Sequence, residues 1–121
     1  MIEERVIKKL KENFYKGIYK NDELQFLDSS TLNHAICLEI AEGTFGNLPI
    51  SYEDLCRKIP RKIGSRSTIL NSLNIAISKK YFIKESVDYD KRIKIYKLSK
   101  NFQETIIDWI NELKVVTSEI N

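Results

Sequence analysis

The spacing of apolar residues changes along this 121-residue chain, and the change limits the folds that it can adopt. Over most of the chain, apolar side chains recur every three or four positions, which is typical of amphipathic helices. In the runs 82–87 and 93–98 they alternate with polar side chains. Alternation on both sides of a short polar segment predicts a β-hairpin, here with its tip at 88–92. We therefore expect a mainly α (α+β) protein with one hairpin.

Capping and breaking residues set the expected helix bounds. The second helix begins near Ser29, a suitable N-cap, and Gly43 is placed to end it. An extended stretch at 47–50 follows, because the residue before a proline avoids the α region. Ser51 with Asp54 three positions later is an acidic variant of the capping box and starts a short third helix. The expected helices are 2–20, 29–42, 52–58, 66–80 and 101–117.

The order of these elements predicts a winged helix-turn-helix. A short helix, a turn and a longer helix lead directly into a basic hairpin, and this is the order of that motif. We expect one domain over residues 1–121, with 29–99 as the winged helix-turn-helix core and 1–20 and 101–121 as dimerisation helices.

The net charge of +3 is unevenly distributed. Residues 51–100 hold 13 Lys and Arg against 5 Asp and Glu, whereas both flanking segments are slightly acidic. A basic middle between acidic ends favours a surface that binds a polyanion, carried on a separate frame for oligomerisation. A merely solvated basic face is the alternative.

Side chains suited to contact DNA gather in and around the predicted motif. One side of helix 66–80 is apolar and includes Ile69, Leu70 and Leu73, while the opposite side is polar and lacks acidic residues. Such a face can lie in the major groove, where Asn reads adenine and Arg reads guanine. Basic groups at the turn and hairpin would contact phosphates or the minor groove. The candidates are Ser65, Arg66, Ser67, Thr68, Asn71 and Asn74 on the recognition helix, Lys91, Arg92 and Lys94 on the wing, and Arg57, Lys58, Arg61 and Lys62 as phosphate contacts.

Residues 48–99 resemble the DNA-binding half of MarR-type transcription regulators. The matching segments are 51–55 in the first helix, 65–69 at the start of the recognition helix, 88–92 at the wing tip and the pair Leu98-Ser99. The glycine that these regulators usually carry after the recognition helix is absent, with Tyr81 or its neighbours in that place. The resemblance implies that Asp90 braces Arg92. It also implies a regulator that binds double-stranded DNA, and occlusion of a promoter makes repression the expected effect.

The two terminal helices carry apolar stripes that one small domain does not bury easily. These stripes predict a homodimer, which suits a palindromic DNA site. Packing of the two helices against each other within one chain is the alternative. The predicted interface residues are Val6, Leu10, Phe14, Phe102, Ile106, Trp109, Ile110 and Leu113.

Other functional classes have weaker support in the sequence. The chain has one histidine, no glycine-rich phosphate loop and no nucleophile with an evident base, so we do not expect an enzyme, a cofactor or a metal. Cys37 and Cys56 are expected to be reduced, with a redox role as a minor alternative. We expect a cytoplasmic protein without a membrane span, and no feature indicates a small-molecule effector. A winged helix that binds an acidic protein, and a plasmid or phage replication or partition protein, stay open.

Overall fold

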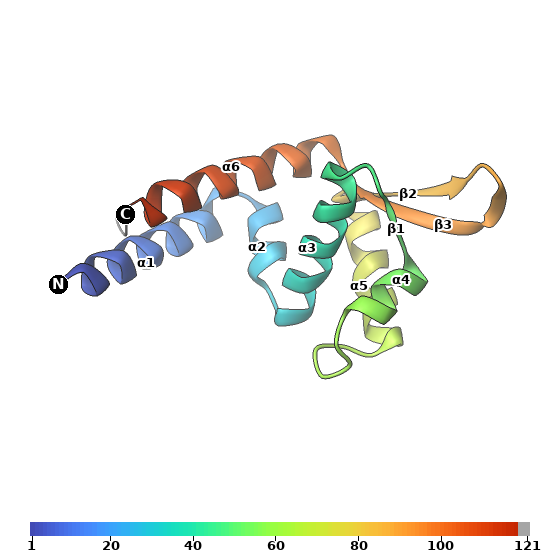
Figure 1. Ribbon diagram of the computed structural model, residues 1–121, viewed down its shortest axis with the longest axis horizontal. Coiled ribbons are helices and arrows are strands. Elements are labelled where there is room, and N and C mark those ends of the chain that lie inside the picture. The colour runs from blue at the N-terminus through green and yellow to red at the C-terminus, as the bar shows by residue number, and fades with distance from the viewer. Residues whose placement is uncertain (119–121) are drawn as a thin grey trace.

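The computed structural model describes residues 1–118, apart from the side chains of residues 18 and 19. This part of the chain is mainly helical, with a small antiparallel sheet, as the sequence predicts. None of its helices combines the length and the apolar content that a membrane span requires. The elements, shown in Figure 1, are α1 (Ile2–Lys20), α2 (Asp22–Asp28), α3 (Thr31–Phe45), β1 (Ile50–Ser51), α4 (Tyr52–Lys58), α5 (Arg66–Ser78), β2 (Phe82–Val87), β3 (Asp90–Leu98) and α6 (Lys100–Thr117).

The molecule has three parts along its longest axis (Figure 1). Helix α1 and the second half of α6 run side by side as an arm that extends away from the rest of the fold. Helices α2 to α5 form the body, and the β2–β3 hairpin projects as a wing from the opposite end. An ion pair between Lys20 and Glu112, 3.3 Å long, joins the two helices of the arm. The wing and the arm therefore lie at opposite ends of the molecule.

The sheet places the wing beside the helix-turn-helix. Its strand order is β1-β3-β2, so β3 pairs with both neighbours. The register sets Ile50 opposite Tyr96 and Phe82 opposite Leu98, and it shifts between Ser86 and Val87. The strand β3 begins at Asp90 rather than at the predicted residue 93, because Asp90 pairs with Val87. The tip is accordingly shorter than the sequence predicts.

A cluster of aromatic rings fixes the base of the wing. Phe82 and Phe102, both almost completely buried, lie with ring centroids 5.8 Å apart. Tyr81 contacts Phe102 at 5.6 Å, and Phe26 of α2 contacts both Tyr81 and Phe82. Tilted and edge-on contacts of this kind add to the free energy of burial. The cluster packs the start of β2, the start of α6 and helix α2 into one core.

Helix α2 was not predicted from the sequence. The sequence predicts only that the first helix ends at residue 20, but the Asn21 side chain then caps a second helix by accepting a hydrogen bond from the Leu24 amide at 2.8 Å. Only seven residues long, α2 nevertheless buries Leu24, Phe26 and Leu27. An Asn cap is a local signal, but seven residues give too few apolar repeats to show a period.

The prediction that Gly43 ends the second helix is wrong. Helix α3 is capped by Ser30 rather than Ser29, and it continues through Gly43 to Phe45. A Cβ atom at Gly43 would lie 2.7 Å from the Leu48 carbonyl oxygen, so this glycine permits close packing of the returning chain. The helix ends where Asn47 adopts a positive φ of 57°, and the Leu48 amide then donates to the Gly43 carbonyl. This is the hydrogen-bond pattern of a Schellman motif.

Helix α5 ends in a similar way, without a glycine. It stops at Ser78, two residues before the predicted end, and Lys80 has a φ of 64°. The Tyr81 amide donates to the Ala76 carbonyl at 2.9 Å, and the Lys80 amide donates to Ile77 at 3.0 Å. Lys80 therefore occupies the left-handed position that glycine normally fills after a helix.

Candidate nucleic-acid interface

The polar side of α5 faces outward, as the sequence predicts. Ile69, Leu73 and Ala76 are buried at 1% exposure or less and anchor the opposite side of the helix. Ser65 caps the helix by accepting from the Thr68 amide, so the helix start is fixed. The residues of the outward side are all exposed; they are Ser65, Arg66, Ser67, Thr68, Asn71, Asn74 and Ser78.

Leu70 departs from the prediction, because it is 42% exposed rather than part of the core. It lines a groove between α5 and the wing, together with Tyr52, Ile93 and Tyr96. The 100° step per residue places Leu70 at the edge of the apolar side of α5. Whether a residue at this edge is buried depends on the packing of the wing, which helical spacing does not predict. Charged residues of α4 and the wing, such as Glu53 and Arg92, line the same groove.

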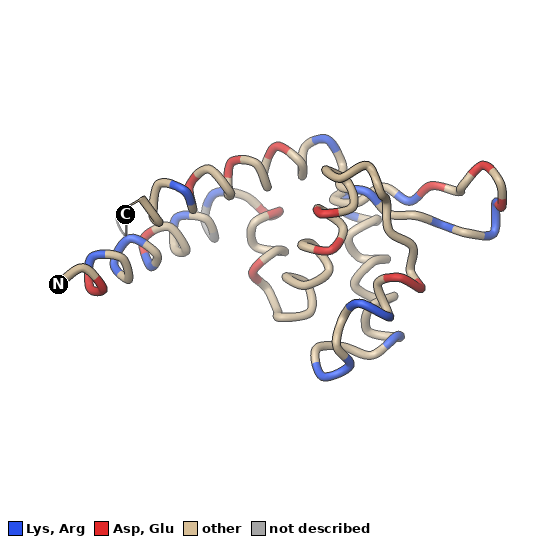
Figure 2. Tube along the Cα trace, viewed as in Figure 1, with Lys and Arg blue, Asp and Glu red and all other residues tan. Residues whose placement is uncertain are grey.

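The helix-turn-helix places basic groups before the recognition helix. The predicted capping box is confirmed: Ser51 accepts from the Asp54 amide, and the Asp54 carboxylate accepts from the Ser51 amide. Asp54 also forms an ion pair with Arg57, and these hydrogen bonds lower the pKa of the Asp54 carboxyl although its partial burial acts in the other direction. Arg57, Lys58, Arg61 and Lys62 are exposed around the turn. Figure 2 shows this turn as a basic corner of the fold.

The wing carries an arginine held by a carboxylate, as the MarR-type resemblance implies. The Asp90 carboxylate accepts from Nε and Nη2 of Arg92 at 3.1 and 3.0 Å, and from the Arg92 amide at 3.0 Å. These hydrogen bonds lower the pKa of the Asp90 carboxyl. The Arg92 side chain stays 91% exposed, so the brace orients it without removing it from solvent.

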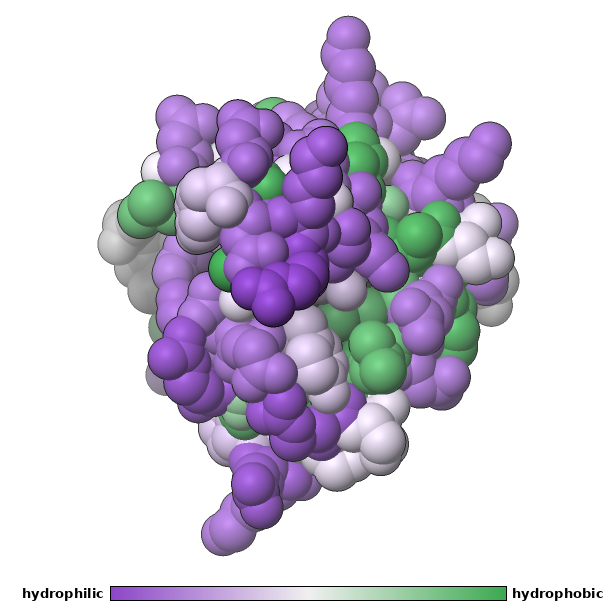
Figure 3. All heavy atoms as spheres, turned by 90° about the vertical axis from the view of Figure 1, so that its right-hand side faces the viewer, coloured by the Kyte–Doolittle hydropathy of each residue, from purple (hydrophilic) through white to green (hydrophobic). Residues whose placement is uncertain are grey.

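The other two predicted DNA contacts of the wing lie close to Arg92. Lys91 is exposed beside Arg92, and the Lys94 ammonium donates to the Ser86 hydroxyl across the hairpin at 2.5 Å. Seen from the wing end, the surface is mostly hydrophilic with a few apolar patches (Figure 3). The predicted wing residues and the predicted recognition helix thus lie at the same end of the molecule.

A contact that the sequence analysis missed joins the two helices of the motif. Arg66 Nη2 donates to Glu53 Oε1 at 2.5 Å, and the guanidinium carbon lies 5.2 Å from the centroid of the Tyr52 ring. The Tyr52 hydroxyl donates to the Arg66 carbonyl at 2.8 Å. The hydrogen bond to Glu53 raises the pKa of Arg66. We call Tyr52, Glu53 and Arg66 the helix-start cluster.

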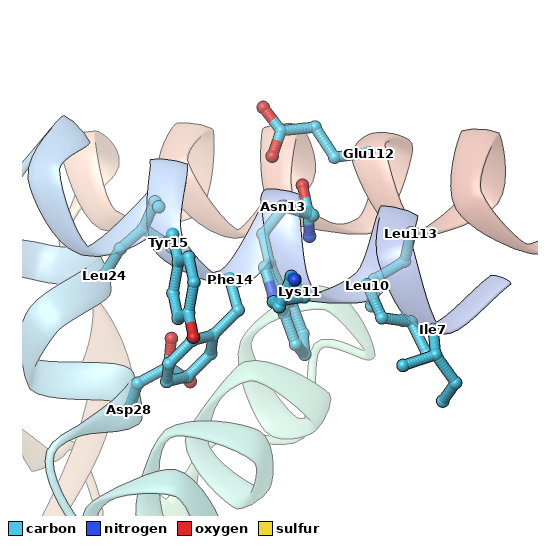
Figure 4. Close-up of a pocket in the computed structure, with 12 residues that line it drawn as sticks. Ile7, Leu10, Lys11, Asn13, Phe14, Tyr15, Leu24, Asp28, Glu112 and Leu113 are labelled. Carbon is cyan, nitrogen blue, oxygen red and sulfur yellow. The ribbon is translucent and has the colours of Figure 1, made fainter. Parts of the chain in front are cut away.

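The arm contains an apolar hollow of about 580 Å³ between α1, α2 and α6 (Figure 4). Four predicted interface residues line it: Leu10, Phe14, Trp109 and Leu113. Ile7 and Tyr15, which also line it, remain more than half exposed. The two helices of the arm pack against each other within the chain and still leave apolar side chains uncovered.

Two of the predicted interface residues are misplaced. Phe102 and Ile106 are 0% and 1% exposed in the core of the chain itself, so they are not available to a partner. Helical spacing puts them on the same stripe as Trp109, but the first half of α6 lies on the body and only the second half belongs to the arm. Val6, Trp109 and Leu113 are half-buried, and Leu10, Phe14 and Ile110 are exposed. Residues 119–121 of the predicted dimerisation helix lie outside the described residues.

The cysteines and the histidine belong to the helical body. Burial raises the pKa of the Cys37 thiol well above its ordinary value, which makes the thiolate scarce, and Cys56 is half-buried. The His34 Nδ1 atom lies 3.3 Å from the Leu27 carbonyl oxygen, and its ring meets Trp109 edge-on. Within residues 1–118, no group of three or more His, Cys, Asp or Glu side chains is arranged to hold a metal ion.

The fold matches that of solved transcriptional regulators. The transcriptional regulator PA4135 superposes with a TM-score of 0.59 at 8% identity, over 98% of this chain and 74% of that one. BldR from Sulfolobus solfataricus gives 0.54 at 16% identity, over 98% and 81%. Streptococcus pneumoniae FabT, solved in complex with DNA, gives 0.58 at 15% identity, over 94% and 78%. No protein-family model and no curated protein sequence matches this chain. The winged-helix fold predicted from the sequence is thus confirmed.

Proposed function

We propose that this protein is a sequence-specific regulator of transcription that binds double-stranded DNA as a homodimer and represses by occlusion. One observation carries the proposal: the polar, acid-free side of α5 faces outward between a basic turn and a basic wing. A winged helix arranged in this way inserts its second helix into the major groove. The complex of FabT with DNA, which has this fold, supports the same use here.

Each part of this end of the molecule is assigned a role in the complex. Asn71 and Asn74 project from the middle of α5 and would read base edges, because a side-chain amide pairs with adenine through two hydrogen bonds. The hydroxyl groups around Ser65 lie at a helix start, where free amides and the helix dipole favour a phosphate. Lys62 and its basic neighbours in the turn would contact phosphates of any sequence. Arg92, oriented by Asp90, would reach the adjacent groove.

The arm is proposed to pair with the arm of a second copy. Its exposed apolar residues include Ile7, Phe14 and Ile110, which are too many for a helix pair that stays in water. In a two-fold dimer, these exposed apolar residues of one arm would pack against those of the other. The two wings would then lie at the outer ends of the pair.

Selection of DNA sites tests the proposal directly. The full chain is mixed with random duplexes, bound duplexes are amplified over several rounds, and the solution mass is measured with and without the winning sequence. We expect a palindromic winner, twice the monomer mass, and a lower transcript yield when the site overlaps a promoter. A protein without duplex affinity at low salt would end the proposal and favour a protein partner for α5. A site unrelated to any promoter would favour replication or partition.

A further inference from the structure

We infer that Glu53 is a specificity-determining residue that directs Arg66 to a base edge and away from the phosphates. The inference rests on the proposed DNA-binding function and adds a residue that needs no DNA contact of its own. Glu53 is acidic, lies at the DNA-facing end and forms its ion pair with a predicted DNA-reading residue. A carboxylate beside a phosphate backbone weakens binding, so its presence there calls for a compensating role.

The helix-start cluster differs from the other two acid–arginine pairs of this surface. Asp54 pairs with Arg57 on the same helix, and Asp90 pairs with Arg92 two residues away on the same strand. The Glu53–Arg66 pair instead joins the first turn of α4 to the first residue of α5, across 13 positions of sequence. It therefore links the two helix starts whose relative placement defines the motif.

The geometry of the cluster restricts the guanidinium in two directions. The guanidinium lies over the Tyr52 ring, and its Nη2 atom donates to the Glu53 carboxylate. The Tyr52 hydroxyl also binds the Arg66 carbonyl, so the backbone is fixed beside the side chain. Since a guanidinium has five N–H donors in one plane, a single carboxylate contact leaves donors for another planar acceptor. Guanine offers such an acceptor pair in O6 and N7.

The same cluster makes a phosphate contact unfavourable. Arg66 and Glu53 are 52% and 66% exposed, so both side chains are accessible to a bound duplex. An unpaired arginine on a flexible stem would move to the nearest phosphate, since that contact is the strongest and is independent of sequence. With Glu53 in place, the pair is nearly neutral, and a phosphate that approaches Arg66 also approaches a carboxylate. Glu53 thus lowers sequence-independent affinity and keeps Arg66 for base recognition.

Substitution of Glu53 by Gln removes the charge and keeps the shape. Affinity for the selected duplex and for a scrambled duplex of equal composition is measured by fluorescence anisotropy between 0.05 and 0.3 M KCl. We expect E53Q to bind the scrambled duplex about eightfold more tightly near 0.1 M salt, with a salt slope steeper by about 0.9, as one added phosphate contact requires. The ratio of selected to scrambled affinity should fall about tenfold, within the range of one bidentate base contact.

Two further variants separate the inference from a general charge effect. Glu104→Gln makes the same charge change at an exposed position in the first half of α6, outside the arm and the candidate interface, and we expect it to alter neither the salt slope nor the ratio. In an Arg66→Ala background, E53Q should no longer raise affinity for the scrambled duplex, because its effect passes through Arg66. Thermal melting of each variant verifies that it is folded.

The outcomes distinguish this inference from the proposed function. If the wild-type protein selects a site but E53Q behaves like E104Q, the role of Glu53 is refuted and DNA binding stands. An equal gain with and without Arg66 also refutes it, because the carboxylate then acts by plain repulsion. If the wild-type protein binds no duplex at all, the proposed function itself fails before the variants are compared.

Discussion

Replacing Lys80 by Gly should stabilise the protein, although the residue is exposed and lies outside every helix and strand. Lys80 has a φ of 64°, which costs a residue with a Cβ atom about 1–2 kcal/mol. Glycine removes this cost, but its greater freedom in the unfolded chain offsets about 0.5–1 kcal/mol of the gain. The expected net increase in the free energy of unfolding is therefore about 0.5–1 kcal/mol, or about 2–4 °C in Tm for a chain of this size.

Lys79 supplies the matched control for this prediction. It precedes Lys80, lies with it beside Asp22 and Glu23, and is likewise exposed, but its φ is −85°. Lys79→Gly should thus lose the same charge and gain only chain freedom, which lowers stability by about 0.5–1 kcal/mol. Urea unfolding followed by circular dichroism, at one protein concentration, measures both variants. If K80G is no more stable than K79G, backbone strain at Lys80 is not what limits stability here.

Four other substitutions test the interface, the dimer and the packing. Asn71→Ala should weaken binding to the selected duplex by about 1–3 kcal/mol and relax the base preference at one position, as anisotropy and a second selection would show. Lys62→Gln should weaken binding to every duplex alike and flatten the salt slope by about 0.9; an effect confined to one sequence would contradict a phosphate contact. Phe14→Glu should give the monomer mass in light scattering, since two buried Phe side chains contribute about 3 kcal/mol or more, whereas Phe45→Glu, at a similarly exposed residue outside the arm, should keep the dimer mass. Gly43→Ala should lower the free energy of unfolding by about 1–3 kcal/mol in urea titration, because the added methyl group lies 2.7 Å from a backbone oxygen.

The elements with strong local signals were predictable from the sequence. The Ser51–Asp54 capping box fixes the start of α4, and the run of alternating residues fixes the strands of the wing. The outward side of α5 followed from the 100° step per residue. Ile69, Leu73 and Ala76 recur at helical spacing and are buried, so the opposite side of the helix is left exposed. These features depend on neighbours in sequence, so periodicity and capping were sufficient to find them.

The features that depend on distant residues were missed or misassigned. The role of Gly43 depends on the Leu48 carbonyl folding back against it, so the glycine looked like a helix end. Phe102 shares a helical stripe with exposed residues of α6, and only its contact with Phe82 shows that the chain itself buries it. The ion pair of Glu53 and Arg66 crosses 13 positions, and no spacing rule within one helix connects them.

The aromatic cluster at the base of the wing also has a consequence for the DNA sites that a dimer would accept. Phe102 of α6 packs on Tyr81 and Phe82 at the base of the hairpin. We therefore expect α6 and the hairpin to move together as one rigid unit. The angle at which the arms of the two copies cross would then set the distance between their two recognition helices. Substitutions that alter this crossing angle should change the number of base pairs between the half-sites and leave the half-site sequence intact.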